Sequence, residues 1–442
     1  MKTTWVRPIG DISTCRLGQV PGRSNPRRST RRIDWRACCT GRTRRLNRCV
    51  FMTASSSTRE SAIQDRVREL MRAEFLVVGS GLSGATIARM LADAGRDVLV
   101  LERRPHVGGN VHDHVHPSGI RVHTYGPHYF RTNDADLWTF VNRFSRFHPF
   151  EAVVKSQVEG GLENWPIAAS YIRREIGTEW EPGFRGKPAN FEEASLALMP
   201  RVIYEAFVKG YTEKQWGCAA TALSATLARR FDVREDDEPR LMRHKYQGIP
   251  HEGYAHFMEN LLDGIPLLKD VDYLQDREAF RAGRCVVFTG PIDEYFGFDL
   301  GRLGYRGQRR EHQYLPDVDW AQPCGQVNNP GLASGAHIRT LEWKYMMPLE
   351  EAARLRGTVL TREFPFTPEN PGEFEYPFPD AANAMLYEAY RQRAEAIPQL
   401  LVCGRLGEYR YYDMDQAIAR AMLHGKRLMK GLGGGYGPNV GV

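Results

Sequence analysis

Three glycines in the pattern Gly-x-Gly-x-x-Gly, at positions 79, 81 and 84, constrain the fold of this chain more than any other feature. A short apolar run, residues 75–78, precedes them, and a second apolar run, residues 98–101, ends at Glu102. Glycine at these three positions permits a tight turn, a close approach of the backbone to a phosphate, and close packing of a helix on a strand. The pattern predicts a strand–helix–strand unit that holds a dinucleotide at the helix N-terminus.

Glu102 and the residues after it indicate which dinucleotide binds. Glu102 follows Gly84 by 18 residues, where an acid can accept a hydrogen bond from a ribose hydroxyl. The stretch 102–110, with an arginine two positions after the acid and a later Gly-Gly pair, resembles the extended fingerprint of large FAD-binding flavoproteins. FAD is therefore favoured over NAD. The residues expected to bind it here are Gly79, Gly81, Leu82, Gly84, Glu102, Arg103, Gly108, Gly109 and Asn110.

The positive charge is concentrated near the N-terminus. The 442 residues carry a formal net charge of +7, but residues 1–51 contain twelve arginines and one lysine against two aspartates, so the rest of the chain is mildly acidic. A segment of this kind could be a basic nucleic-acid arm or a transit peptide. Met71 just before the first apolar run instead favours a start at Met52 or Met71. We therefore expect residues 1–70 to be a disordered basic extension upstream of the true start of translation, and we expect no nucleic-acid partner.

Membrane insertion and metal binding are not expected. No run approaches the 18 apolar residues that a membrane span needs. The four cysteines after residue 51 are scattered without metal-ligand spacing, which favours a reducing, cytoplasmic setting. His112, His114 and His116 alternate as on one face of a strand, but no carboxylate or thiol pattern completes a zinc site. The sequence therefore predicts no metal.

The order of apolar patterns predicts interleaved domains. The expected fold class is α/β: a Rossmann-like FAD-binding domain with an interleaved helical insert and a second, mixed or antiparallel β-sheet substrate domain. Apolar runs at 285–288 and 400–402 predict strands that return to the first sheet, and residues 337–345 predict a strand of the second sheet. The expected boundaries are 71–150, 246–300 and 386–432 for the FAD-binding domain, 151–245 for the insert, 301–385 for the substrate domain and 433–442 for a flexible tail.

Four further segments occur in a recognisable order. They are Gly-Tyr-Thr-Glu-Lys-Gln-Trp-Gly at 210–217, Tyr-Gln-Gly-Ile-Pro at 246–250, Thr-Gly-Pro-Ile-Asp at 289–293 and Gly-Arg-Leu-Gly-Glu-Tyr-Arg-Tyr-Tyr-Asp-Met at 404–414. Together with the glycine motif they resemble the bacterial UDP-galactopyranose mutase family, and the resemblance spans residues 75–429. It implies an isomerase that interconverts UDP-galactopyranose and UDP-galactofuranose, a step in galactofuranose and cell-wall polysaccharide biosynthesis.

The resemblance also implies the cofactor and partners. FAD acts in its reduced form, its N5 atom attacking the anomeric carbon of the sugar, and the reaction has no net redox change. An external reductant such as NAD(P)H and a homodimeric assembly are further implications.

Individual residues take expected roles from the same resemblance. Arg234 and Arg339 match two arginines placed against the substrate diphosphate, and His128 matches a residue beside the flavin; these three are the expected catalytic residues. The other residues expected to bind substrate are Tyr211, Trp216, Tyr246, Arg306, Tyr376 and Tyr411, and further FAD contacts are expected from Gly290, Arg405, Asp413 and Met414. Taken singly, each could be a surface ion pair or a packing aromatic, and the motifs favour the ligand roles.

Some positions depart from the family pattern. Arg131 replaces a second histidine near the flavin, Trp343 and Tyr345 alter the segment after the diphosphate arginine, and no sugar-contacting asparagine is found around residues 147–150. A mutase for another nucleotide sugar, a flavin oxidoreductase of the amine-oxidase type and a non-catalytic binding paralogue are therefore alternatives. The arginines and tyrosines favour an anionic substrate over the apolar substrate of an oxidase.

Overall fold

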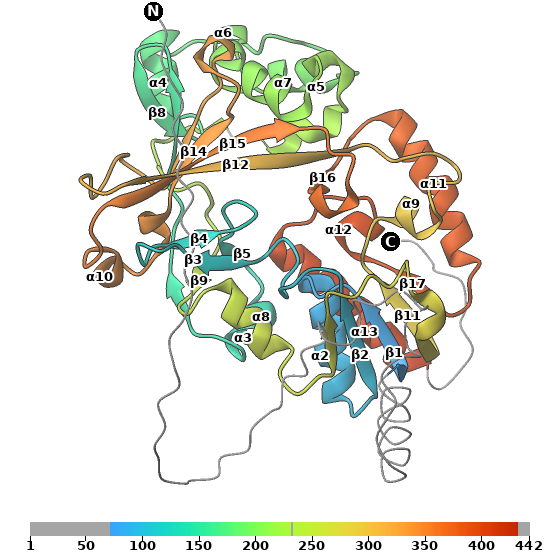
Figure 1. The fold of residues 1–442 in the computed structure, drawn as a ribbon. Coiled ribbons are helices and arrows are strands. Elements are labelled where there is room, and N and C mark those ends of the chain that lie inside the picture. Colours follow the sequence, from blue (N-terminus) through green and yellow to red (C-terminus); the bar gives the residue numbers. More distant parts are fainter. Residues whose placement is uncertain (1–70, 231–232, 432–442) are drawn as a thin grey trace, which may run out of the picture. The chain divides into compact units, whose positions relative to one another are not determined.

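Five strands from distant parts of the chain form a parallel sheet in the computed structural model, which describes residues 71–230 and 233–431 (Figure 1). They are β1 (Arg72–Val78), β2 (Val98–Glu102), β10 (Leu267–Lys269), β11 (Arg281–Phe288) and β17 (Leu400–Val402). Their order is β10-β2-β1-β11-β17, and every neighbouring pair is parallel. β2 is buried along its whole length, as parallel strands usually are. The predicted α/β class and the strands at 285–288 and 400–402 are confirmed.

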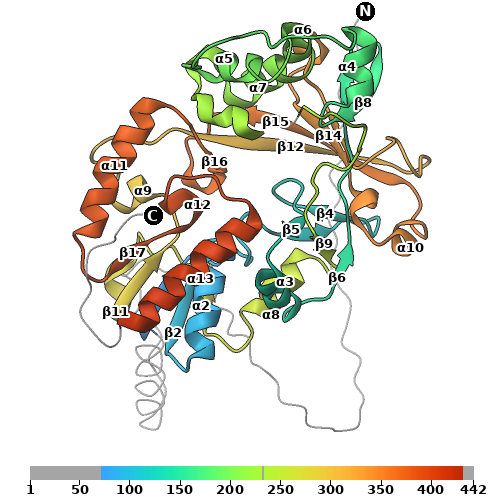
Figure 2. The same ribbon diagram turned by 180° about the vertical axis from the view of Figure 1, so that it is seen from behind.

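Two helices, one from each end of the described chain, lie side by side against this sheet (Figure 2). They are α2 (Leu82–Asp93) and α13 (Met414–Lys430). They approach closely because Gly425 has no side chain: a Cβ there would lie 2.8 Å from Met90 Sδ. Asp413 caps α13 in a capping box with Gln416. This packing brings the glycine motif and the C-terminal segment to one edge of the sheet.

A second, seven-stranded sheet has the order β16-β12-β15-β14-β13-β7-β8. Its strands are β7 (Val154–Val158), β8 (Gly161–Trp165), β12 (Tyr305–Leu315), β13 (Gln326–Asn328), β14 (Arg339–Glu342), β15 (Thr358–Phe366) and β16 (Tyr376–Pro377). β13 and β7 are parallel and the other neighbours are antiparallel, so the predicted mixed sheet is confirmed. The register places Arg339 opposite Glu363 and Arg306 opposite Tyr376.

Two segments differ locally from the predicted pattern. The strand expected at 337–345 ends at Glu342, and Trp343–Met346 form a 3-10 turn. The region 151–245, expected to be a helical insert, opens with β7 and β8, which join the mixed sheet because alternate residues of β7 are buried. Its helices follow and lie on one side of that sheet in both views (Figures 1 and 2). They are α4 (Ala169–Glu175), α5 (Phe191–Leu196), α6 (Arg201–Tyr204) and α7 (Gly210–Trp216).

Two small sheets lie on the other side of the mixed sheet in both views (Figures 1 and 2). One pairs β3 (Asp113–Val115) with β4 (Arg121–His123), and the other has the order β5 (Phe130–Thr132), β9 (Tyr246–Pro250), β6 (Phe147–Pro149). The remaining α-helices are α3 (Ala135–Asn142), α8 (Tyr254–Leu261), α9 (Ile292–Tyr295), α10 (Leu349–Ala352), α11 (Ala381–Glu395) and α12 (Gly404–Gly407).

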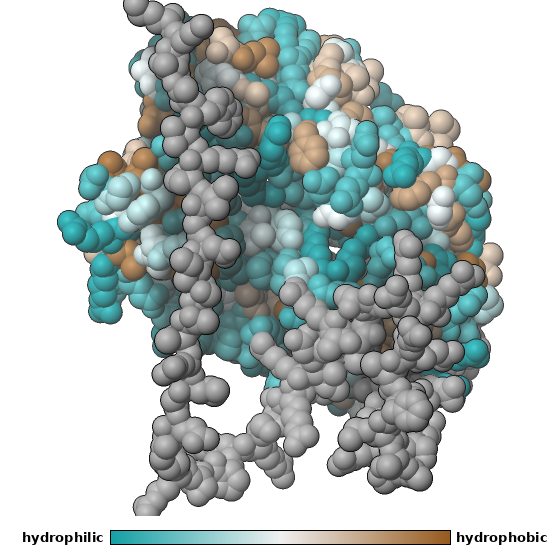
Figure 3. All heavy atoms as spheres, in the orientation of Figure 1, coloured by the Kyte–Doolittle hydropathy of each residue, from teal (hydrophilic) through white to brown (hydrophobic). Residues whose placement is uncertain are grey.

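All described residues belong to one compact unit of the chain, and the domain boundaries given above stay a prediction. The expected basic extension, residues 1–70, and the expected tail, 433–442, lie outside the described residues. Among the residues that are described, no helix is both long and apolar enough to span a membrane. On the face drawn in Figure 3, hydrophobic residues are scattered among hydrophilic ones.

Candidate functional site

The glycine motif forms a tight turn between β1 and α2. Gly79 has a φ of +100°, a conformation that favours glycine. Gly84 lies under the start of α2, where a Cβ would come within 2.1 Å of the Gly79 carbonyl oxygen. At Gly81 an added Cβ would meet only Gly108 and Gly109, at 4.0 and 3.8 Å. Gly84 therefore serves packing of the helix on the strand, whereas Gly81 leaves room on the side where a phosphate would approach.

A pocket extends from this turn along the edge of the parallel sheet. Most of the residues predicted to bind the cofactor line it, and so does the predicted catalytic histidine. They are Gly79, Gly81, Leu82, Glu102, Arg103, Gly108, Gly109, Asn110, His128, Gly290, Arg405 and Met414. Gly84 lies beneath the helix instead, and Asp413 is the N-cap of α13 directly before Met414.

The acidic end of the pocket is built around Glu102. One carboxylate oxygen accepts hydrogen bonds from the Ser80 N–H and hydroxyl, at 2.8 and 2.6 Å, and the other accepts from the Arg104 N–H, at 2.8 Å. Arg103 donates both terminal nitrogens to Glu294, at 2.9 and 2.7 Å. Glu102 is thus held rigidly as an acceptor at the pocket wall.

This donor set fits a dinucleotide such as FAD. The open side of Gly81 and the N-terminus of α2 suit a pyrophosphate, and Glu102 at the C-terminal end of β2 suits a ribose hydroxyl. Pocket residues Val271, Asp272 and Tyr273 were not predicted from sequence, because they lie in a segment without a motif.

His128 lines the pocket as a neutral imidazole. Its Nδ1 lies 2.8 Å from the Gly126 carbonyl oxygen, which can only accept, so Nδ1 carries the proton and Nε2 does not. The main-chain N–H of His128 donates to Nδ1 of His123, at 3.0 Å. Burial lowers the pKa of both His128 and His123 to about 3. A buried neutral histidine thus supports a second one at the pocket wall.

Acidification is expected to destabilise the protein through His123, which is 2% exposed. An unfolded histidine has a pKa of about 6.5, whereas that of folded His123 is about 3. Between these values the unfolded state binds more protons, so the free energy of unfolding falls with falling pH by up to about 1.4 kcal/mol per pH unit for this residue. Urea unfolding at pH 7 and pH 5 measures this loss, and His123→Gln should reduce it. An equal loss in that variant would contradict the assignment.

Arg339 begins β14 and is held on one side only. Its Nε donates to Glu363, and burial, which lowers the pKa of Arg339, is overcome by that carboxylate, which raises it. Tyr211 and Tyr376 lie close enough to contribute to the same effect. Within residues 71–230 and 233–431, the structure gives the two terminal nitrogens of Arg339 no acceptor. These nitrogens are therefore available to an anionic ligand.

Tyr376 of β16 meets Tyr411 and Arg405 of the segment 404–414 nearby. The rings of Tyr376 and Tyr411 are stacked, with centroids 6.1 Å apart. The Arg405 guanidinium lies 4.8 Å from the Tyr411 ring and 5.8 Å from the Tyr376 ring. Burial raises the pKa of Tyr376, so its hydroxyl stays protonated and able to donate. Because Arg405 also lines the cofactor pocket, this group connects that pocket to the Arg339 region.

Three charged residues of this region were missed from sequence: Arg310, Glu363 and Glu375. Glu363 lies between Arg339 and Arg310, and Glu375 pairs with Arg310. No local signal marked them, because strand register and not sequence spacing brings them together.

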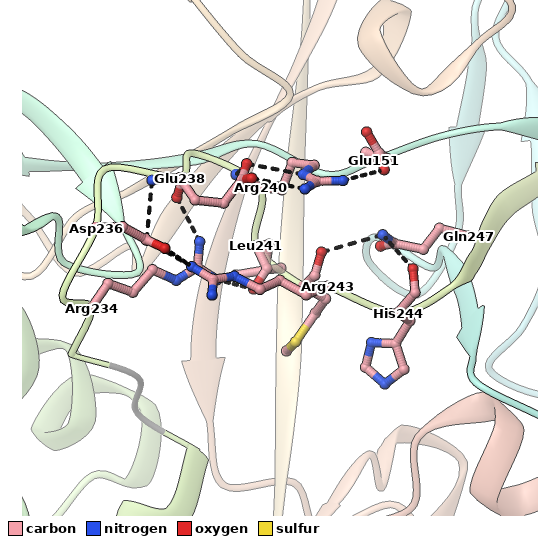
Figure 4. A network of polar contacts seen from close by, with 10 residues as sticks. Glu151, Arg234, Asp236, Glu238, Arg240, Leu241, Arg243, His244 and Gln247 are labelled. Atoms are coloured by element: carbon pink, nitrogen blue, oxygen red, sulfur yellow. Dashed lines mark hydrogen bonds and ion pairs between the residues drawn. The ribbon is translucent and has the colours of Figure 1, made fainter.

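Arg234 lies in the loop before β9 (Figure 4). It is 5% exposed, and its guanidinium donates to the main-chain carbonyls of Glu238 and Leu241. Its predicted role at the diphosphate stays a prediction.

The other residues predicted to bind substrate either bond to the end of a helix or pack against another aromatic ring. Arg306 donates to the carbonyls of Gln215 and Lys214, at 2.8 and 3.3 Å, and thereby fastens the end of α7, which carries Tyr211 and Trp216. Trp216 packs edge-on against Phe378, and Tyr246 stacks on Trp138. Whether they contact substrate stays a prediction.

The positions that depart from the family pattern fall into two groups. Trp343 is fully buried in the core and donates to Thr361 Oγ1, and the Tyr345 hydroxyl donates to the Gln322 carbonyl. Arg131 instead pairs with Asp413 at 3.0 Å, and Tyr411 lies close enough to affect its pKa. Of the three, Arg131 is therefore the one placed beside the Tyr376–Tyr411 pair.

His112 and His114 both lie near Thr124 Oγ1, at 2.8 and 3.0 Å. Among the described residues, no group of three histidine, cysteine or acidic side chains is arranged to hold a metal ion.

Comparisons with known proteins agree with this geometry. A family model described as UDP-galactopyranose mutase matches residues 206–411, and one described as NAD(P)-binding Rossmann-like domain matches residues 77–144. A dTDP-fucopyranose mutase of Escherichia coli is 32% identical over 368 residues, which cover 79% of this chain and 96% of that protein. A probable UDP-galactopyranose mutase of Klebsiella pneumoniae is 33% identical over 364 residues, covering 79% and 92%.

A crystal structure of reduced UDP-galactopyranose mutase has the same fold. It superposes with a TM-score of 0.62 at 14% identity, over 81% of this chain and 96% of that one.

Proposed function

Because this chain belongs to the UDP-galactopyranose mutase family, we propose that it is a flavin-dependent isomerase that interconverts UDP-galactopyranose and UDP-galactofuranose. The observation that carries the proposal is Arg339, whose terminal nitrogens are open to an anion beside Tyr376 and Tyr411. A permanently charged, planar guanidinium suits a diphosphate. A sugar nucleotide with its diphosphate at Arg339 would have its sugar next to the cofactor pocket, which Arg405 links to this region.

The residues of the chain hold and orient the substrate. Reduced FAD, when bound, supplies a nucleophile for the anomeric carbon. Arg339 and the hydroxyls of Tyr376 and Tyr411 hold the diphosphate close to the anomeric carbon between its departure and its return. Arg234 is proposed as a second diphosphate ligand on the family resemblance. His128, with Nδ1–H bonded to Gly126, can take or return a proton only at Nε2.

Several finer points are part of the proposal. We propose FAD as the flavin, which the residues at 102–110 and the pocket also support, and a cytoplasmic location, which the scattered cysteines favour. NAD(P)H as an external reductant, a homodimeric assembly and a role in galactofuranose biosynthesis follow from the family resemblance.

A second candidate is the same reaction on a different nucleotide sugar. The similarity to a dTDP-fucopyranose mutase and the presence of Arg131 beside Tyr411 favour this variant. A flavin oxidoreductase of the amine-oxidase type is less favoured, because its apolar substrate would not need a buried arginine with free terminal nitrogens.

Reduction of the flavin is expected to switch on turnover. The dithionite-reduced protein is incubated without oxygen with UDP-galactofuranose, and the pyranose product is separated by chromatography beside an oxidised control. Conversion only in the reduced sample would support the proposal, and conversion in neither would contradict it.

Parallel incubation with dTDP-fucofuranose separates the two mutase candidates. Faster conversion of the dTDP sugar would favour the second candidate. Binding of UDP without turnover of either sugar would identify a non-catalytic paralogue.

A further inference from the structure

Four charged side chains, three of them buried and Arg339 partly exposed, alternate in the order Arg339, Glu363, Arg310, Glu375. One oxygen of Glu363 accepts from Arg339 Nε, and the other accepts from Arg310 Nε, at 2.9 Å. Arg310 donates its two terminal nitrogens to the two oxygens of Glu375, at 2.9 and 2.8 Å. The side chains of Arg310, Glu363 and Glu375 are at most 7% exposed. Two positive charges therefore balance two negative charges within one largely buried group.

Arg310 is fully engaged by the protein. Besides its bonds to the two carboxylates, its Nη1 donates to the Gln308 carbonyl, at 3.2 Å. All three of its guanidinium nitrogens thus have acceptors, in contrast to Arg339. Arg310 is therefore placed to orient other groups and not to bind a ligand itself.

The chain of charges contacts the segments that carry the proposed ligands. Glu375 directly precedes Tyr376, and its carbonyl accepts from Arg405 at 3.4 Å. On the other side, a Cβ at Gly126 would lie 2.7 Å from Glu363, and the Gly126 carbonyl accepts a hydrogen bond from His128 Nδ1. One ion network thus braces β14, β16 and the loop before β5.

Removing Arg310 would change how Glu363 pairs with Arg339. Arg339 and Arg310 share Glu363 and hold the pKa of this carboxyl below its ordinary value, although burial opposes them. Burial raises the pKa of Glu375, although its ion-pair partner Arg310 and the nearby Arg405 oppose that rise. Without Arg310, Glu363 would be free to turn both oxygens toward Arg339 and draw its guanidinium away from the proposed position of the diphosphate.

We propose that Arg310 and Glu375 are positioning residues that keep the terminal nitrogens of Arg339 directed at the substrate diphosphate. This inference rests on the proposed function, in which Arg339 binds that diphosphate. It concerns affinity for the nucleotide diphosphate, which can be measured without turnover.

The test removes the ion pair as a unit. In Arg310→Met/Glu375→Gln both charges disappear, so no buried carboxylate is left unpaired. Calorimetric titration of the oxidised FAD-bound protein with UDP is expected to show a Kd about tenfold higher than that of the wild type, the size typical of coupling between contacting residues. FAD content should be unchanged. Arg393→Met is the control, because Arg393 also forms a two-pronged ion pair, with Asp299, but is partly exposed on α11.

A double-mutant cycle separates positioning from a general loss of stability. In an Arg339→Gln background the pair replacement should change the Kd for UDP by less than about twofold, because its effect passes through Arg339. An equal loss of UDP affinity in both backgrounds would overturn the proposal. A pair replacement that leaves the Kd for UDP unchanged in the protein with wild-type Arg339 would also overturn it. If the double replacement does not retain FAD, Glu375→Gln alone is measured, with an increase of about threefold expected; no increase would overturn the proposal.

The outcomes distinguish this inference from the proposed function. A wild-type protein that neither binds UDP nor converts a nucleotide sugar would contradict the function itself. A wild-type protein that does both, with a double variant of unaltered Kd, would contradict only the positioning role.

Discussion

Replacement of Arg339 by alanine is expected to lower kcat/KM for the nucleotide sugar by about 100- to 1,000-fold, the range typical for loss of one preorganised charge-stabilising group. The reason is that its terminal nitrogens are the ones left open to an anion, whereas its Nε is bound to Glu363. FAD should remain bound, because Arg339 is not among the residues that line the cofactor pocket. Steady-state kinetics of the reduced enzyme and the flavin absorbance of the same sample measure both effects.

Arg339→Lys is the matched variant. Lysine keeps the charge but cannot bond Glu363 and a diphosphate at the same time through a planar fork, so an intermediate rate is expected. A variant with alanine that keeps a near-normal kcat/KM would remove Arg339 from the site. Loss of FAD in either variant would indicate a structural role instead.

Replacing two glycines of the same motif by alanine is expected to have different effects, one on stability and the other on FAD binding. Gly84→Ala places a Cβ 2.1 Å from the Gly79 carbonyl oxygen, so it should lower the free energy of unfolding by about 3 kcal/mol. Gly81→Ala meets nothing closer than 3.8 Å and has a φ of −67°, which alanine adopts readily. This variant should fold normally but bind FAD on the order of 100-fold more weakly, equivalent to about 2.8 kcal/mol.

Urea unfolding of the apoprotein and titration with FAD distinguish the two effects. Gly95→Ala, at the other end of α2, is the control: nothing lies within 4 Å, and its φ of +71° should cost only about 1 kcal/mol. A Gly81→Ala protein with wild-type FAD affinity would show that no phosphate approaches this turn. Equal destabilisation by the Gly81 and Gly84 replacements would contradict the division of roles.

Most of the cofactor pocket could be predicted from sequence because its parts act locally. The turn at Gly79, the packing of Gly84 and the acid at Glu102 all follow from sterics within one strand–helix–strand unit, and the structure places Gly79 and Glu102 at the pocket. The later segments were predictable only through family resemblance, since periodicity alone does not distinguish Tyr376 or Arg405 from any partly buried aromatic or surface arginine.

Other parts could not be predicted because burial and register decide them. Trp343 departs from the family pattern in a segment expected to continue the strand, but β14 ends at Glu342 and the next residues turn into the core, where the indole is fully buried. Arg306 was predicted to bind substrate, which stays a prediction; its bonds to the carbonyls at the end of α7 depend on strand pairing beside Tyr376, which the sequence did not indicate. Each outcome depends on neighbours far away in sequence.

The sequence by itself therefore determined the dinucleotide-binding unit, the α/β class and the family, because glycine sterics and short motifs act over a few residues. Only the tertiary structure decided how Arg339, Tyr376, Tyr411 and Arg405 meet beside one pocket. It also decided that Arg310 and Glu375 form the ion pair behind them. The physical reason is that cross-strand register and exclusion of water, which no local pattern encodes, select the partners of each buried charge.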